Sequence, residues 1–143
     1  MLIGIPAILG PELLFTLRGM GHGDEIALVD GNFPAVEAAR RLVRADGLAL
    51  PDLLEAVLAV MPLDRAVPGG AIFRAAEGND PARAAAIHHR IDAVCARMAP
   101  DFTVTALDGA ALYPRIRAAH ALVATGERAL YANVILRKGV IDP

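Results

Sequence analysis

The sequence predicts an α/β fold in which helices cover both faces of a central sheet. Short apolar segments that are typical of strands alternate along the chain with segments of helical periodicity. Hydrophobic residues make up 55% of the 143 residues and charged residues 21%, enough apolar material for a substantial core. A chain of this length corresponds to one domain, over residues 1–143.

The first half of the chain is expected to supply three helices and two strands. Pro11 suits a first helical position and Gly21 can end the turn, which predicts a helix over 11–20. The segment EIALVD, residues 25–30, is a short apolar strand that ends in an acid. Two further helices, over 35–47 and 51–61, and a strand over 69–76 complete this half.

The second half continues the alternation. Residues 79–100 predict the clearest helix, with Asp80 as its cap, Pro81 at its first position and Pro100 at its end. Strands are expected over 101–107, 121–125 and 133–140, and a helix over 108–121 with Pro114 in its first turn.

Charge and composition argue against several classes of partner. The net charge is −2 and the chain has no tryptophan, so neither a basic surface nor an aromatic platform for nucleic acid is indicated. The densest apolar stretch, 53–63, is shorter than the roughly 20 apolar residues that cross a bilayer. The N-terminus lacks a basic region and a clear cleavage site, so we expect no signal peptide.

Two further features concern surface and cysteine chemistry. A mean hydropathy of +0.45 is high for a chain of this size, which favours a homo-oligomer whose interfaces cover apolar surface. Cys95 is the only cysteine, so no intrachain disulfide or cysteine metal cluster can form, and we expect it to be buried in a helix.

The residues with the clearest chemical potential lie at the two ends of the chain. His22 stands between two glycines ahead of a strand, where it can transfer protons or be a surface loop histidine. Asp30 ends that strand and can face a ligand or cap a turn. Tyr131 and Asn133 are expected on one side of a strand end, where they can read sugar hydroxyls, or be a buried tyrosine and a turn asparagine.

Other polar residues fit no motif. Asp24 and Glu25 are expected to be solvated acids, either of which could orient His22. His88 and His89 diverge by about 100° on a helix, so they cannot share a metal in the usual way, and we expect them to be exposed or at an interface. His120 is interpreted as a lone structural histidine on a helix. No metal spacing, nucleophile elbow, phosphate loop or dinucleotide fingerprint is present, so no cofactor or metal is expected.

Two long motifs carry a resemblance to a known family. The runs GMGHGDEIALVDGNFPA and TGERALYANVILRKGV resemble the ribose pyranase and fucose mutarotase family, as do the opening MLIGIPAILGPELL and the central RADGL. The likeness covers nearly the whole chain, and GHGDE with LRKGV is closer to the fucose mutarotase members.

The resemblance implies a three-layer α/β/α single domain with a mixed central sheet, assembled into a cytoplasmic homodecamer or similar ring with active sites at subunit boundaries. It also implies that His22 is the catalytic acid/base. Asp30, Tyr131 and Asn133 match the sugar-contacting positions, and Ala132 supplies backbone between the last two.

One position departs from the family pattern. Fucose-type members carry an arginine, and ribose-type members a histidine, four residues before the tyrosine that matches Tyr113. This chain has Gly109 there. Asp108, Arg115 or Arg117 are the nearby polar residues that could compensate.

The expected function is therefore interconversion of the anomers, or of the pyranose and furanose forms, of a free aldose such as L-fucose. Ring opening and closure need only proton transfer and positioning, which explains why no cofactor motif is required. The alternative from another class is a monosaccharide-binding or sugar-transport subunit without turnover, which Gly109 favours. An assembly scaffold without either activity is the third reading.

Overall fold

A six-stranded mixed sheet lies at the centre of the structure, a computed structural model that describes residues 1–142. The strand order is β2-β5-β1-β6-β3-β4, and β6 alone runs against the other strands. The strands are β1 (Glu25–Val29), β2 (Leu42–Ala45), β3 (Ile72–Ala75), β4 (Val104–Leu107), β5 (Ala121–Thr125) and β6 (Val134–Arg137).

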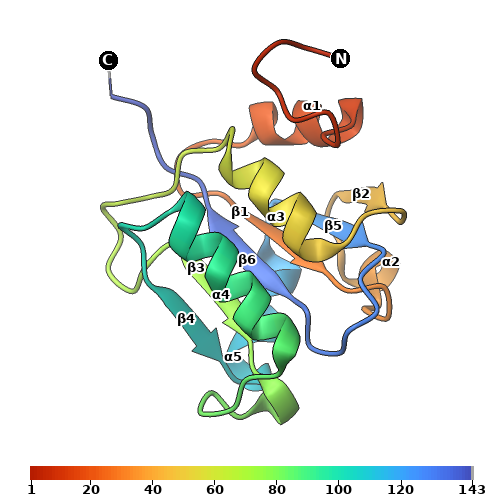
Figure 1. Cartoon of the computed structure of the whole chain (residues 1–143), viewed down its shortest axis with the longest axis vertical. Helices are drawn as coiled ribbons and strands as arrows, with labels where there is room; N and C mark the ends of the chain where they lie inside the picture. The colour runs from red at the N-terminus through yellow and green to blue at the C-terminus, as the bar shows by residue number, and fades with distance from the viewer. Residues whose placement is uncertain (143) are drawn as a thin grey trace.

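Helices cover both faces of this sheet, so the predicted three-layer α/β/α fold is confirmed. Helices α1, α3 and α4 lie on one face, and α2 and α5 lie on the other (Figure 1). Their bounds are α1 (Pro11–Gly19), α2 (Ala35–Ala38), α3 (Leu50–Leu58), α4 (Ala86–Met98) and α5 (Gly109–Ala118), with a short 3₁₀ helix η1 (Glu77–Asn79) before α4.

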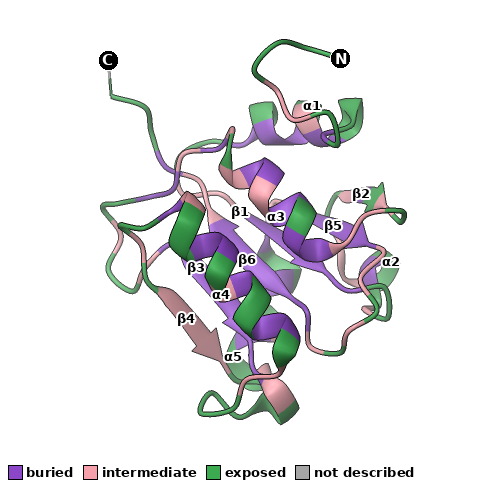
Figure 2. Ribbon diagram, viewed as in Figure 1, coloured by how far each residue is buried: buried purple, intermediate pink, exposed green. Residues whose placement is uncertain are grey.

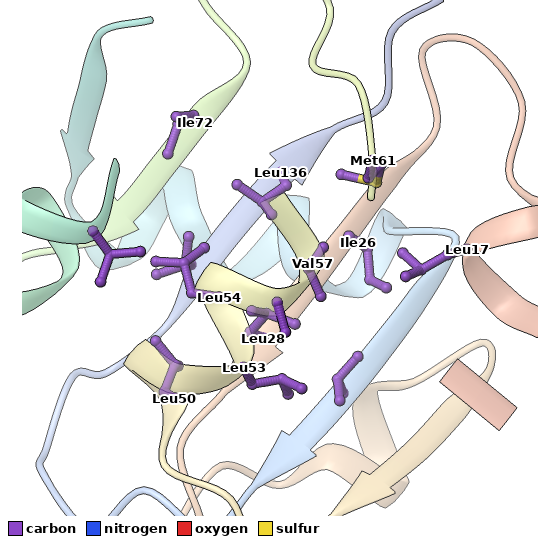
Figure 3. Packing of buried hydrophobic residues seen from close by; sticks show 14 of the residues in the cluster. Leu17, Ile26, Leu28, Leu50, Leu53, Leu54, Val57, Met61, Ile72 and Leu136 are labelled. Atoms are coloured by element: carbon purple, nitrogen blue, oxygen red, sulfur yellow. The ribbon is translucent and has the colours of Figure 1, made fainter. Parts of the chain in front are cut away.

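The core divides into two clusters because successive side chains of a strand point to opposite faces. In β1, Ile26 and Leu28 join the cluster under α1, α3 and α4, whereas Ala27 and Val29 join the cluster under α2 and α5. Figure 3 shows the apolar side chains of α3 directed onto β1 and β6. The central strands are buried and β4 at the sheet edge is only half-buried (Figure 2).

β1 takes both of its partners from the far end of the chain. It pairs in parallel with β5 and antiparallel with β6, with Leu28 opposite Val123 on one side and Val134 on the other. The loops after the parallel strands therefore gather at one edge of the sheet, and the chain that leads into β6 joins them there. This edge, which we call the carboxyl edge, is where ligands bind in open α/β sheets.

Three of the expected elements are wrong in part. Residues 35–47 form only the short helix α2, after which Ala39 is extended and β2 pairs with β5, so tertiary pairing overrides a helical pattern. The helix expected from Asp80 begins at Ala86 instead, because the Asp80 carboxylate accepts the Ala82 N–H in an isolated turn.

Pro114 also lies deeper in its helix than expected. It is the sixth residue of α5, beyond the first turn, where it leaves the Ala110 carbonyl without a helical donor. Cys95 is buried in α4 as predicted, and burial raises the pKa of its thiol to about 12. Among residues 1–142, no helix has the length and apolar character needed to cross a membrane.

Candidate active site

Asp30 follows β1 directly and is buried at the carboxyl edge, with 6% of its surface exposed. Its Oδ1 accepts the Asn32 N–H at 2.9 Å, and its own N–H donates to Asn133 Oδ1 at 3.3 Å. Burial raises the pKa of the Asp30 carboxyl, and the N–H donor from Asn32 offsets this only in part. The group is therefore both a turn residue and a buried carboxyl at the ligand-binding edge.

The segment Tyr131–Asn133 lies beside Asp30 because β6 runs antiparallel to β1. Tyr131 has a φ of 61°, and its carbonyl accepts the Asn133 N–H at 3.0 Å. Ala132 and Asn133 are buried, whereas Tyr131 is half-buried. The four residues predicted to contact sugar thus come together, but through a tight turn ahead of β6 and not through the strand alternation that the sequence indicated.

A cavity opens next to Asp30 at the same edge. It has a volume of about 320 Å³, within the range of small-molecule pockets. The residues that line it include Asp30, Phe33 and the ion pair between Arg44 and Asp46. An aromatic side chain together with charged hydrogen-bonding groups can bind a polyhydroxylated ring.

Gly109 lies further along the carboxyl edge, and its missing side chain leaves room for two neighbours. A β-carbon at this position would lie 2.8 Å from Asn79 Oδ1 and 2.9 Å from Tyr113 Cε2. The Tyr113 ring packs near Phe33, with ring centroids 6.3 Å apart. Asn79 therefore lies against the position from which the arginine or histidine implied by the resemblance would extend, and nothing in the sequence pattern singled it out.

The polar residues proposed to compensate for Gly109 are engaged elsewhere. Asp108 caps α5 by accepting the Ala111 N–H at 2.8 Å. Arg115 binds the Glu25 carboxylate with its Nε 2.9 Å from Oε2, and its guanidinium lies over the Phe73 ring. Arg117 is exposed and lies about two turns after Gly109 in α5.

His22 lies at the other end of β1. It belongs to the loop between α1 and β1, and β1 alone spans about 16 Å at 3.3 Å per residue. Within one chain the structure therefore does not bring His22 together with Asp30 or the segment Tyr131–Asn133. Its side chain is 53% exposed, so its ring is open to the surroundings of the subunit.

The group that orients His22 is Asp64, which the sequence did not indicate. His22 Nε2 lies 3.3 Å from Asp64 Oδ2, and Arg137 Nε donates to the same oxygen at 3.1 Å. The Ala66 N–H lowers the pKa of the buried Asp64 carboxyl most, followed by His22 and Arg137. Asp64 lies in an irregular segment that runs beside the end of β6: its N–H donates to the Arg137 carbonyl at 3.1 Å, and Leu63 forms an antiparallel bridge with Lys138.

The acids expected to be solvated have their own partners. Glu25 begins β1 and is bound by Arg115, so it is neither a loop residue nor free to orient His22. Asp24 accepts the Gly21 N–H at 2.8 Å and lies 3.4 Å from His120, which is outside any helix. Of the two glycines beside His22, only Gly23 has a positive φ, 84°, and its N–H donates to the Lys138 carbonyl.

His88 is the clearest correction among the histidines. It was expected to be exposed or at an interface, yet it is completely buried in the first turn of α4, whereas its neighbour His89 is exposed. Helical periodicity could have separated the two histidines, because His88 lies three and seven residues before the buried Ile91 and Cys95, whereas His89 is in register with Asp92 and Arg97. Among residues 1–142, no three His, Cys, Asp or Glu side chains are grouped to hold a metal ion.

Known proteins match this chain along nearly its whole length. A family described as the RbsD / FucU transport protein family matches residues 3–141. The fucose mutarotase of Bos taurus is 43% identical over 148 aligned residues, covering 100% of this chain and 96% of that protein.

Two solved structures are similar throughout. The fucose mutarotase of Streptococcus pneumoniae in complex with L-fucose superposes with a TM-score of 0.82 at 40% identity, covering 99% of this chain and 100% of that chain. FucU of Bifidobacterium longum superposes with a TM-score of 0.87 at 35% identity, covering 97% and 99%.

Proposed function

This chain belongs to the RbsD / FucU transport protein family, and from this premise we propose that it is a monosaccharide mutarotase. It is an isomerase that interconverts the anomers of a free aldose, L-fucose first among the candidates, because relatives that span its whole length are fucose mutarotases. The observation that carries the proposal is the convergence of Asp30, Tyr131 and Asn133 at the carboxyl edge, where Asp30 also lines a cavity. Residues 1–143 act as one sugar mutarotase-like domain.

The chemistry needs only protons and positioning. A base removes the proton of the anomeric hydroxyl while an acid supplies one to the ring oxygen, so the hemiacetal opens to an aldehyde. Rotation of the aldehyde and reclosure on its other face give the second anomer. Proton transfer by a positioned side chain contributes about 10²–10⁴-fold to such a rate.

Each site residue has a role in this scheme. His22 moves the proton at the anomeric centre. The Asp30 carboxylate accepts a hydrogen bond from a sugar hydroxyl or orients the imidazole. The Asn133 amide and the Ala132 backbone bind the sugar ring. The Tyr131 hydroxyl contacts the sugar and can carry the second proton.

The proposal includes a site shared between subunits. His22 is separated from the carboxyl edge of its own chain, yet its ring is half exposed, so a neighbouring copy is the source of the histidine for each site. The surface has apolar side chains for such an assembly, at Leu2, Ile3, Phe15, Val140 and Ile141 among others. We propose a cytoplasmic homo-oligomer, with a decamer as the expected size.

Exchange NMR on equilibrated L-fucose, ribose, galactose and rhamnose tests the activity directly. The wild-type protein should give cross-peaks between the anomers of its substrate. His22→Ala should reduce exchange by at least about 10²-fold, because its proton carrier is lost. His89→Ala, which removes an exposed histidine outside the site, is the matched control and should exchange at the wild-type rate.

The second candidate is a sugar-binding subunit without turnover, and Gly109 is the observation that favours it. That function predicts thermal stabilisation by a sugar without any exchange. Full activity of the His22→Ala variant would remove His22 from the mechanism. Absence of exchange with every sugar would remove the mutarotase activity itself.

A further inference from the structure

His88 is a buried histidine to which the proposed mechanism assigns no role. Both of its ring nitrogens have backbone partners. Nδ1 lies 2.9 Å from the Ala85 nitrogen, at the start of α4, and Nε2 lies 3.0 Å from the Tyr131 carbonyl oxygen. The first turn of α4 lies beside the chain that leads into β6 (Figure 1), so this side chain bridges two segments 43 residues apart.

The partners determine which nitrogen carries the proton. The backbone N–H of Ala85 can only donate, so Nδ1 must accept. A neutral imidazole with an accepting Nδ1 has its proton on Nε2. His88 therefore donates its Nε2–H to the Tyr131 carbonyl.

That carbonyl belongs to a strained residue. The φ of 61° at Tyr131 is unfavourable for a side chain of this size, and such a conformation persists only where its surroundings impose it. The same carbonyl accepts the Asn133 N–H at 3.0 Å, so His88 and Asn133 hold it from two directions.

The network continues to the remaining sugar-contacting residue. Asn133 Oδ1 accepts the Asp30 N–H at 3.3 Å, which ties the turn to the end of β1. A continuous series of hydrogen bonds therefore runs from the buried His88 imidazole through Tyr131 and Asn133 to Asp30.

We infer that His88 is a positioning residue of the sugar site: its Nε2–H fixes the Tyr131 carbonyl and thereby sets the direction of the Tyr131 phenol and the Asn133 amide. The inference rests on the proposed function for the identity of the ligand. Its geometric basis, a buried donor on a strained turn, does not depend on which sugar binds.

Two conservative substitutions separate this role from a general contribution to folding. In His88→Asn the amide oxygen can still accept the Ala85 N–H, but the shorter side chain cannot reach the Tyr131 carbonyl. In His88→Gln an amide N–H can take the place of Nε2–H. We expect His88→Asn to raise KM and lower kcat/KM at least about tenfold, and His88→Gln to stay within about threefold of the wild type, because small misplacements of site groups are costly.

The controls make each outcome decisive. His89→Asn changes the adjacent exposed residue and should leave KM and kcat unchanged. A purely structural His88 would reduce the folded fraction in both variants and leave the KM of the folded protein unchanged. Equal KM values for His88→Asn and His88→Gln would overturn the inference.

A measurement without substrate tests the role of His88 even if the proposed function is wrong. The ¹⁵N spectrum of the imidazoles in the full-length wild-type protein should show the Nε2–H tautomer for His88, and an Nδ1–H tautomer would refute the bond to Tyr131. If the wild type exchanges no sugar, the mutarotase proposal fails. In that case the Kd for L-fucose, measured by calorimetry, replaces KM in the comparison of His88→Asn with His88→Gln. If no sugar binds, the tautomer of His88 alone decides whether the inference stands.

Discussion

At the scale of the residue, the fold buries the carboxyl group of Asp30 at the carboxyl edge of the sheet, where burial of its charge costs free energy. Asp30 lies buried at the end of a central strand, where its carboxylate accepts the Asn32 N–H and its own N–H donates to the Asn133 amide oxygen. Because burial disfavours the charged form, the pKa of Asp30 is higher in the folded chain than in the unfolded one.

The direction of this pKa shift predicts that removing the Asp30 charge makes the protein more stable and less active. Above the folded pKa of Asp30 the carboxyl is charged in both states and its burial lowers the free energy of unfolding. Below the unfolded pKa it is neutral in both and the effect disappears. Asp30→Asn keeps an oxygen for the Asn32 N–H, so it should raise the melting temperature at about pH 7 and lose this advantage at about pH 3, below the unfolded pKa of the carboxyl.

Activity should change in the opposite direction. Loss of a charged acceptor for a sugar hydroxyl is worth about 1.5–3 kcal/mol, so kcat/KM of Asp30→Asn should fall by about 10–100-fold. Thermal melts at both pH values and exchange NMR check the two expectations on one variant. A melting temperature lowered at about pH 7 would show that the carboxylate stabilises the fold.

At the scale of the element, the N-terminus of α5 and η1 share one small space. Gly109 begins α5, and the Asn79 side chain from the end of η1 fills the position of its absent β-carbon. Asn79 itself has a φ of 61°, a conformation that asparagine tolerates better than most residues. The two elements are therefore fitted to each other at the site edge.

This fit predicts energetic coupling between the two positions. Gly109→Ala should be tolerated better in the Asn79→Gly background than alone, with a coupling energy of about 0.5–3 kcal/mol in a double-mutant cycle of unfolding free energies. Gly47, whose β-carbon would meet nothing within 4 Å, supplies the control, and Gly47→Ala should add to Asn79→Gly without coupling. Additive behaviour at Gly109 would show that Asn79 moves aside freely.

The elements also show where local sequence information is sufficient. The strand at 25–30 and the strand at 121–125 were predictable because uninterrupted apolar runs between turn signals define a central strand. β2 was not, because LVRA has no strand pattern of its own and extends only through pairing with β5. The start of α4 was missed because its first turn is capped by the His88 ring and not by Asp80.

At the scale of the whole molecule, the candidate site residues lie at opposite ends of one strand. Sequence resemblance identified His22 and Asp30 together, and the strand predicted over 25–30 already lay between them, but the sequence did not show which other side chains each of them meets. Asp64 and His88 escaped prediction for a related reason, since each is brought to its partner only by tertiary contacts.

Sharing of sites between subunits predicts complementation. His22→Ala and Tyr131→Phe homo-oligomers should each be weakly active. When the two variants are mixed equally, unfolded and reassembled, roughly a quarter of the sites would combine an intact histidine with an intact tyrosine. Recovery of about that fraction of the wild-type exchange rate is expected, and no recovery in verified mixed oligomers would place both residues in the site of one chain.

The pairing of β1 has a consequence for how the protein is made. Residues 25–29 emerge early during synthesis, yet both of their neighbours, β5 and β6, are translated about a hundred residues later. Until residue 125 has left the ribosome, β1 has no native partner on either side, and its second partner is complete only at residue 137. During that interval the helices of the first half of the chain, or chaperones, are left to shield this strand, and the sheet can form only once its late partners have emerged.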